Sequence, residues 1–248
     1  MEIILVGAGN MGSSMLKGLS KYKIYVVEKD INKLNNLKKT YPNIKPVVEI
    51  PNTNGKILIL AVKPQVLSSI KTKGKAKAVI SILAGTPISK IKEQIDARYY
   101  IRAMPNIAAL NLKSVTSVVG DIEFKNEALE ILSSIGKAIW LNSEKELDIA
   151  TGLAASSPAW LAIVAEAMAD GAVNLGLPRD KAYEYLGGLF EGVGSVLDSK
   201  HPALFKDMVC SPGGTTIAGV AKLEKEGVRS AFIEAMEECY NRACKLAQ

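Results

Sequence analysis

Residues 2–12 read Glu2-Ile3-Ile4-Leu5-Val6-Gly7-Ala8-Gly9-Asn10-Met11-Gly12, an apolar run that ends in a glycine-rich turn. The run predicts a buried strand, and residues 13–19 suit the helix that follows such a turn. In a dinucleotide-binding turn of this spacing, the first glycine reverses the chain, the second admits the backbone to a pyrophosphate, and the third lets the helix pack on the strand. We therefore expect a nucleotide-binding α/β fold at the start of the chain.

A second apolar stretch, Lys23 to Val27, leads into Glu28 and Lys29. An acidic residue at this place accepts hydrogen bonds from the adenosine ribose of a bound dinucleotide. The expected cofactor-binding residues of this region are Gly7, Gly9, Asn10, Met11, Gly12, Glu28 and Lys29. A glycine-rich turn that binds no ligand is the alternative, because this motif alone is weak evidence.

Strand and helix signals alternate through the first half of the chain. Further strands are expected at 57–62, 78–83, 99–102, 114–119 and 138–141, with helical spacing from residue 31 and again at about 126–134. This order predicts a Rossmann-type doubly wound sheet, whose ligands lie at the carboxyl ends of the strands. Lys63-Pro64, Ala84-Gly85 and Met104-Pro105-Asn106 all fall at that edge.

From about Ser143 the strand signals stop and alanine becomes frequent. The sequence therefore predicts a dinucleotide-binding domain over residues 1–142 and an all-α C-terminal domain over residues 143–248. Helices are expected from Pro158 to about Leu175, and near the end of the chain at about 217–226 and 228–246. Small side chains all around a helix permit burial on every side, and a helix pair from a second subunit could supply that cover.

Composition narrows the class of protein. Hydrophobic residues make up 48% of the 248 residues, enough for a sizeable core, and the longest uncharged stretch, Ile149–Ala165, is too polar and interrupted for a membrane span. The start of the chain does not resemble a signal peptide, and three cysteines without a CxxC pair indicate free thiols in a reducing cytoplasm. We expect a cytoplasmic protein with no bound metal and no membrane partner.

The formal net charge of +6 is unevenly distributed. Residues 1–142 hold 21 basic and 10 acidic side chains, a net charge of +11, whereas residues 143–248 hold 10 and 15, a net charge of −5. A phosphate-bearing cofactor accounts for the basic half, and nucleic acid is the alternative. Because no aromatic residues are interleaved with Lys71, Lys73, Lys75 and Lys77, we interpret this run as a solvated loop and expect no nucleic-acid partner.

The stretch that carries the chemistry is Cys210-Ser211-Pro212-Gly213-Gly214-Thr215-Thr216-Ile217-Ala218-Gly219, at the predicted start of a helix. Backbone N–H groups exposed at the glycines, the hydroxyl groups and the helix terminus together favour a small carboxylate. The alternative is an ordinary N-cap formed by Thr215 or Thr216. We interpret the single histidine, His201, as structural.

The chain resembles the pyrroline-5-carboxylate reductases, which reduce a cyclic imine to proline with a nicotinamide cofactor. The resemblance spans nearly the whole chain and rests on the 7–12 turn, Ala61-Val62-Lys63-Pro64-Gln65, Arg102-Ala103-Met104-Pro105-Asn106, Ala169-Asp170-Gly171, Gly176-Leu177-Pro178-Arg179 and the 211–219 stretch. It implies that Thr216 is the catalytic residue and faces the ring nitrogen, that Ser211, Gly214, Thr215 and Asn106 bind the substrate, and that Ala61, Lys63, Pro64 and Ala84 line the cofactor. It also implies a homodimer, or a higher homo-oligomer built from dimers, that acts on a small imino acid.

The sequence departs from the family pattern in one place. Ala154-Ala155-Ser156-Ser157-Pro158-Ala159 stands where the family usually has Ser-Gly-Ser-Gly-Pro-Ala. Added methyl and hydroxymethyl groups need room, so we expect the packing of this helix to differ from that of relatives.

Two other functions remain open. Hydride transfer to a protonated imine needs no strong acid, and none lies within 211–219. A hydroxyacid dehydrogenase of similar two-domain plan would need a catalytic lysine near the start of the helical domain, and residues 152–165 contain none. A non-catalytic nucleotide- or nucleic-acid-binding protein is the second alternative.

For the cofactor we expect NADH or NADPH, with NADH favoured. A 2′-phosphate beside Glu28 would meet a like charge, although Lys29 offsets part of that repulsion.

Overall fold

A computed structural model of the protein describes residues 1–247, with side chains as far as residue 245. By their packing these residues form two compact units. The first unit holds residues 1–157 and the chain from Glu238 onward, and the second holds Pro158–Glu237.

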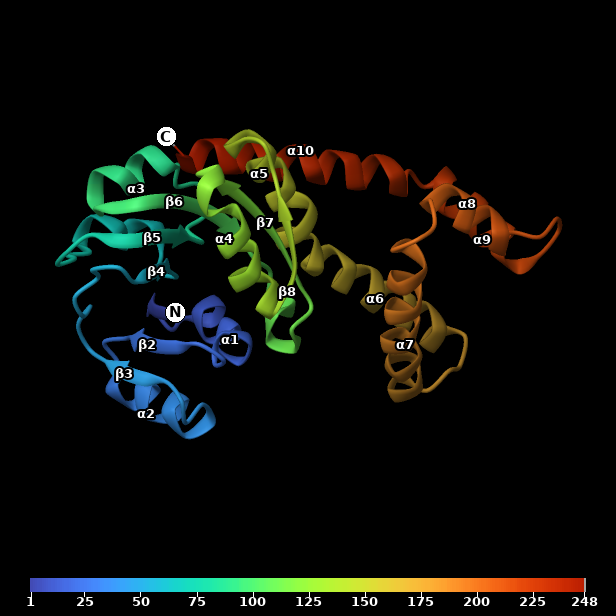
Figure 1. The fold of residues 1–248 in the computed structure, drawn as a ribbon. Coiled ribbons are helices and arrows are strands. Elements are labelled where there is room, and N and C mark those ends of the chain that lie inside the picture. Colours follow the sequence, from blue (N-terminus) through green and yellow to red (C-terminus); the bar gives the residue numbers. More distant parts are fainter. Residues whose placement is uncertain (248) are drawn as a thin grey trace. The chain divides into compact units, whose positions relative to one another are not determined.

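The first unit is built on one eight-stranded sheet with the strand order β3-β2-β1-β4-β5-β6-β7-β8 (Figure 1). Only β6 and β7 pair antiparallel, and all other neighbours in the sheet are parallel. The strands are β1 (Glu2–Val6), β2 (Lys23–Val27), β3 (Lys45–Val47), β4 (Ile57–Leu60), β5 (Ala76–Ser81), β6 (Ala97–Met104), β7 (Ser114–Gly120) and β8 (Gly136–Trp140). The expected Rossmann-type sheet is thus confirmed, with β3 as a short edge strand that the sequence pattern did not predict.

Helices cover both faces of this sheet, which explains the fully apolar strands. On β1, Ile3 and Leu5 point to the core under α1 (Asn10–Leu19), α2 (Ile31–Thr40) and α4 (Lys125–Leu132). Ile4 and Val6 point to the opposite core, under α3 (Ile88–Gln94) and the 3₁₀ segment Pro64–Ser69. Successive residues of a strand face opposite sides, so β4 and residues 3–6 of β1, which are buried on both sides, are apolar throughout. Three shorter 3₁₀ segments are Ile107–Asn111, Ile122–Phe124 and Ser133–Ile135.

The sheet unit continues past its last strand. α5 (Glu144–Ala150) buries Leu147 against Met104 and Val119 of the sheet, and a π-helical turn, Thr151–Ser156, follows it. The packing of α5 therefore places the division of the chain at Ser157, later than the expected boundary after Asn142. The functional division into 1–142 and 143–248 stays a prediction.

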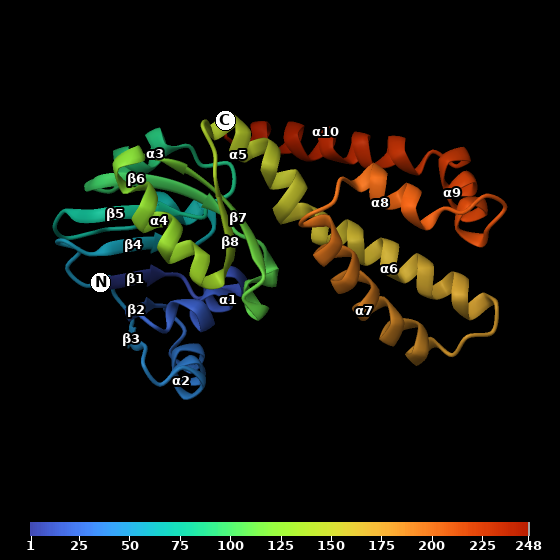
Figure 2. The ribbon, with the colours of Figure 1, turned by 45° about the vertical axis from the view of Figure 1, so that its right-hand side comes forward.

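The second unit is entirely helical. Its helices are α6 (Ser157–Asn174), α7 (Arg179–Leu197), α8 (Pro202–Val209), α9 (Thr215–Lys225) and α10 (Val228–Ala247), the last of which belongs to the first unit from Glu238 onward. α6 and α7 pack side by side through Ala169, Ala182 and Leu186 (Figure 2). Few other apolar side chains of this unit are buried, and many large ones are exposed.

One described segment, the continuous helical run Glu144–Asn174, contains an 18-residue stretch with a mean hydropathy of 1.4, which is long enough and apolar enough to pass for a membrane span. Only 11% of its most apolar stretch is buried within the chain. Length and composition alone do not separate a membrane helix from a helix that another subunit covers.

Candidate active site

The glycine turn has the geometry that a dinucleotide requires. Gly7 has φ +95°, and a Cβ added there would lie 2.6 Å from the carbonyl oxygen of Ala61. A Cβ on Gly12 would lie 2.1 Å from the carbonyl oxygen of Gly7, so neither position admits a side chain. Gly9 instead faces open space, with no heavy atom within 4 Å of its added Cβ. The turn is therefore closed on the protein side and open where a phosphate would approach.

The helix behind this turn leaves its first N–H groups available. Gly9 is the N-cap residue of α1, and no side chain caps the helix there. Free N–H groups and the positive end of the helix dipole favour an anion at this point. The residues present therefore fit a pyrophosphate.

A cavity of about 660 Å³ opens at the carboxyl ends of β1, β2 and β4. It brings together six of the expected cofactor residues, Gly7, Gly9, Glu28, Lys29, Ala61 and Lys63. Five others, Asn10, Met11, Gly12, Pro64 and Ala84, are not on its wall. Asn10 and Gly12 belong to the start of α1, whereas Pro64 begins a 3₁₀ segment and Ala84 follows β5.

The cavity wall also includes residues that the sequence pattern did not indicate. The segment after β3 contributes Val48, Glu49 and Ile50, and the connection between β4 and β5 contributes Val66, Ser69, Ile70, Lys71 and Lys73. No strong signal marks them, because β3 is only three residues long and contains a proline.

Glu28 turns its carboxylate back toward the glycine turn. The backbone N–H of Ala8 donates to Glu28 Oε2 at 3.2 Å, and the N–H of Lys29 donates to Oε1 at 2.8 Å. Lys33 Nζ lies 3.9 Å from Oε2. The half-buried carboxylate is thus fixed on the cavity wall, at the end of β2.

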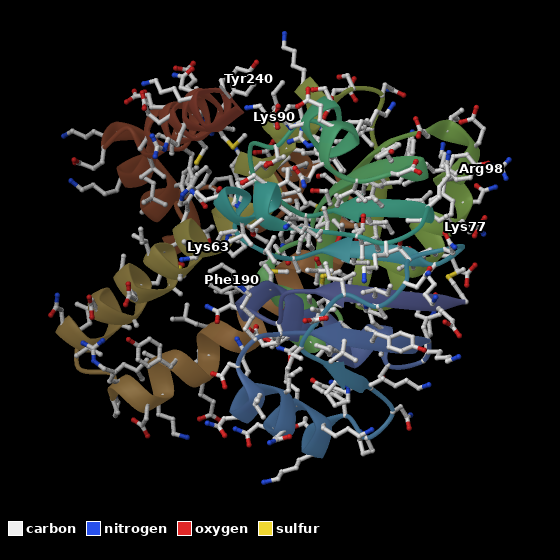
Figure 3. All side chains as sticks on the ribbon, turned by 90° about the vertical axis from the view of Figure 1, so that its left-hand side faces the viewer. Lys63, Lys77, Lys90, Arg98, Phe190 and Tyr240 are labelled. Carbon is white, nitrogen blue, oxygen red and sulfur yellow. The ribbon has the colours of Figure 1, made fainter. Side chains whose placement is uncertain are left out.

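The lysine run is divided between two edges of the sheet. Lys71 and Lys73 line the cavity, whereas Lys77 lies at the start of β5 beside Arg98 of β6, far from Lys63 (Figure 3). Lys77 pairs with Glu127, and Lys75 Nζ lies 3.6 Å from a carboxylate oxygen of Asp96. The interpretation of this run as one solvated loop is therefore wrong for Lys77, because Lys77 belongs to a strand.

In the second unit, the stretch from Ser211 to Thr216 forms a tight turn at the start of α9. Gly213 has φ +68°, and the N–H of Gly214 donates to the carbonyl oxygen of Ser211 at 3.0 Å. Gly214 is the N-cap of α9 and no side chain caps the helix, so neither Thr215 nor Thr216 acts as the cap. Their hydroxyl groups are exposed, and the first N–H groups of α9 have no side-chain partner.

Two residues of the α8 region, just before this turn, have assignable roles. His201 Nδ1 accepts from the N–H of Ala203 at 3.3 Å and caps α8, the structural role expected for it. A hydrogen bond with Asp207 raises the pKa of Lys206, so this lysine stays protonated at neutral pH. Among the described residues no group of three or more His, Cys, Asp or Glu side chains is arranged to hold a metal.

Asn106 lies at the carboxyl end of β6, but its side chain is not free. Its Nδ2 donates to the carbonyl oxygen of Ala154 at 2.9 Å, and its Oδ1 accepts from the N–H of Ala108 at 3.1 Å. The residue is 8% exposed.

Arg102 lies on β6, four residues before Asn106, and it joins α5 to the sheet. It donates to Glu144 and Asp148, each at 2.9 Å, with only 3% of its side chain exposed. Glu144 also accepts from the N–H of Ile88 at the start of α3 at 2.9 Å. A single buried guanidinium therefore joins three elements of the first unit.

Two parts of the chain match models of known protein families. Residues 144–246 match the family model of pyrroline-5-carboxylate reductase dimerisation, and residues 2–85 match the model of NADP oxidoreductase, coenzyme F420-dependent. The pyrroline-5-carboxylate reductase of Synechocystis sp. is 36% identical over 100% of this chain and 99% of its own length.

Solved structures agree with this match. A pyrroline-5-carboxylate reductase from Coxiella burnetii has a TM-score of 0.85 at 27% identity, over 99% of this chain and 98% of the other. Plasmodium falciparum pyrroline carboxylate reductase, solved with NADP bound, has a TM-score of 0.82 at 23% identity, over 100% and 98% of the two chains, and shares the fold.

Proposed function

The chain belongs to the pyrroline-5-carboxylate reductase family, and we infer that it transfers a hydride from NAD(P)H to the cyclic imine 1-pyrroline-5-carboxylate to give L-proline, the last step of proline biosynthesis. The observation that carries this conclusion is the full-length likeness to curated reductases. A hydroxyacid dehydrogenase or a non-catalytic binding protein would not account for that likeness.

The first unit would hold the cofactor in its cavity. The N–H groups behind Gly9 would bind the pyrophosphate, Glu28 the adenosine ribose, and Ala61 and Lys63 the remainder. Pro64 and Ala84 lie off the cavity wall, so their contacts with the cofactor rest on the family resemblance alone. When bound, the reduced nicotinamide supplies the hydride. The protein itself needs only to orient the reactants and exclude water.

The second unit would hold the imine. The N–H groups at the start of α9 and the hydroxyls of Ser211 and Thr215 can bind the substrate carboxylate, with Gly214 leaving room for the Ser211 side chain. Thr216 would face the ring nitrogen and exchange a hydrogen bond as the amine forms. The nitrogen can enter already protonated, so the protonated Lys206 is not required as an acid.

We propose NADH as the preferred cofactor. Glu28 presents a fixed carboxylate on the cavity wall, where a ribose diol could donate to it and a 2′-phosphate would be repelled. Lys29 and Lys33 lie near enough to weaken the repulsion, so the proposal is a preference and not an exclusion.

The protein is a homo-oligomer, as its dimerisation domain indicates. We propose a homodimer, or a larger assembly built from dimers, that forms through the helical unit and works in the cytoplasm. The exposed apolar side chains of this unit support the proposal, as does a groove of about 540 Å³. Five apolar residues line this groove together with three charged ones, namely Val220, Leu223, Val228, Phe232 and Ile233 with Lys206, Glu224 and Arg229.

One assay tests the reaction and the cofactor together. Nicotinamide oxidation is followed with pyrroline-5-carboxylate, separately with NADH and with NADPH, and we expect turnover with a higher kcat/KM for NADH. Turnover of a 2- or 3-hydroxy acid without turnover of the imine would instead favour a dehydrogenase. Duplex DNA binding that weakens steeply with salt, without any turnover, would favour the non-catalytic alternative.

A further inference from the structure

The helical run that leads from the first unit into the second has a carbonyl group that cannot receive the usual α-helical hydrogen bond. Pro158 has no N–H, so the carbonyl of Ala154, four residues earlier, receives no α-helical hydrogen bond. The backbone widens at this point. Residues 151–156 are π-helical, and the N–H of Ser157 donates to Gly152, five residues back. π-helical turns are rare and often mark functional sites.

A side-chain donor comes from the segment that follows β6. Asn106 Nδ2 lies 2.9 Å from the Ala154 oxygen, across 48 residues of sequence. The two other side-chain hydrogen bonds at this turn stay within the same helical run. Thr151 Oγ1 donates to Leu147 at 2.9 Å, and Ser157 Oγ donates to Leu153. Among the described side-chain hydrogen bonds, the Asn106 bond alone ties this turn to another element.

Asn106 is itself held rigidly. Its Oδ1 accepts from the N–H of Ala108, and its own N–H donates to Ser114 Oγ at 3.1 Å. Ser114 Oγ lies 3.0 Å from Thr116 Oγ1, and both of these residues are fully buried in β7. A side chain fixed in this way can hold the Ala154 carbonyl in one position.

We propose that Asn106 is a positioning residue. Its side-chain amide takes the place of the N–H that Pro158 lacks, and so fixes the π-helical turn 151–156, the joint through which the chain leaves the first unit. The inference rests on the proposed function, since its effect on catalysis is a change in how the helical unit presents the imine. Asn106 would then act without touching the substrate, in place of the substrate contact that the family resemblance implies.

Three variants isolate the bond. Asn106→Asp keeps the size and the Oδ1 acceptor but loses the donor, and Asn106→Ala removes both. Asn111→Ala is the matched control, because Asn111 is exposed at the end of the same 3₁₀ segment. In both Asn106 variants we expect KM for the imine to rise roughly tenfold, as for one lost buried hydrogen bond, with the NADH Kd within about twofold of wild type.

A second readout does not depend on activity. Amide hydrogen exchange at residues 152–157 should become roughly tenfold faster in Asn106→Ala and stay unchanged in Asn111→Ala. In a Trp140→Phe background, which leaves Trp160 as the sole tryptophan, the emission should shift in the Asn106 variants only. If the wild type fails to reduce the imine, the proposed function fails, while the exchange experiment still tests the joint.

A double-mutant cycle with Pro158→Ala gives the decisive result. Alanine restores an N–H at 158 that can donate to Ala154 once the turn takes α-helical register, and Asn106 is then dispensable. We expect Asn106→Ala to change KM and exchange far less in the Pro158→Ala background than in the wild type. Equal effects in the two backgrounds, or unchanged exchange in Asn106→Ala, would overturn the proposal.

Discussion

At the scale of single residues, Glu28 is the side chain through which the protein would discriminate between its two possible cofactors. Its carboxylate is held at the glycine turn by the N–H of Ala8. Glu28→Asn removes the charge and weakens the bond to a ribose hydroxyl, so we expect the ratio of kcat/KM for NADH over NADPH to fall about tenfold. Glu49→Gln is the control, because it removes another carboxylate from the same cavity wall. A wild type that prefers NADPH, with a ratio insensitive to Glu28→Asn, contradicts the assignment.

Thr216 gives a second prediction at this scale. Its hydroxyl does not cap α9, which leaves it available to the substrate. Thr216→Ala should lower kcat by the equivalent of about 2 to 4 kcal/mol, the cost of one positioned hydrogen bond in the transition state, with NADH affinity unchanged in a fluorescence titration. Thr216→Ser should recover much of the activity. Normal turnover in the alanine variant would show that Thr216 has no role in catalysis and is only part of the first turn of α9.

The sequence predicts residue roles well where they depend on local backbone geometry. Gly7, Gly9 and Gly12 have the constraints that the motif requires, because each follows from the path of a single turn. The bond from Asn106 to Ala154 could not be predicted in this way. It depends on where two elements far apart in the sequence come together, although the absent N–H of Pro158 does mark the carbonyl that needs a partner.

At the scale of elements, Arg102 joins β6 to α5 and, through Glu144, to α3. Arg102→Met should leave two carboxylates without their cation and lower the free energy of unfolding by about 3 kcal/mol, measured as a reduced urea midpoint. Lys222→Met, which breaks an exposed pair with Glu226 on α9, should change it by less than about 1 kcal/mol. Equal effects from the two variants would show that the buried pair contributes no more than a surface one.

Strands could be predicted from the sequence where burial on both faces requires apolar residues. The central strands are mostly apolar because helices cover both faces, so their positions could be predicted from the sequence to within about two residues. β3 was missed because three residues with a proline carry too little pattern. The antiparallel pairing of β6 with β7 was also missed, because strand direction depends on the path of the connection and not on side-chain period.

At the scale of the whole molecule, the sequence predicted a sheet domain followed by helices, but not where packing divides them. α5 has a helical sequence and yet packs on the sheet through Leu147. The last residues of α10, from Glu238 onward, likewise belong to the first unit although they end the chain. Such returns of the chain depend on tertiary contacts that composition and periodicity do not encode.

The helical unit exposes many large apolar side chains, and this gives the last prediction. Ile163 on α6 is 64% exposed, and Ile122 in the first unit is similarly exposed at 61%. If the helical unit forms the subunit interface, Ile163→Glu places a charge in a buried contact and should lower the mass measured by light scattering at micromolar concentration. Ile122→Glu should leave the mass unchanged, because its surroundings stay in water. A wild type with the mass of one chain, or equal effects from the two variants, would show that the apolar helices serve some purpose other than assembly.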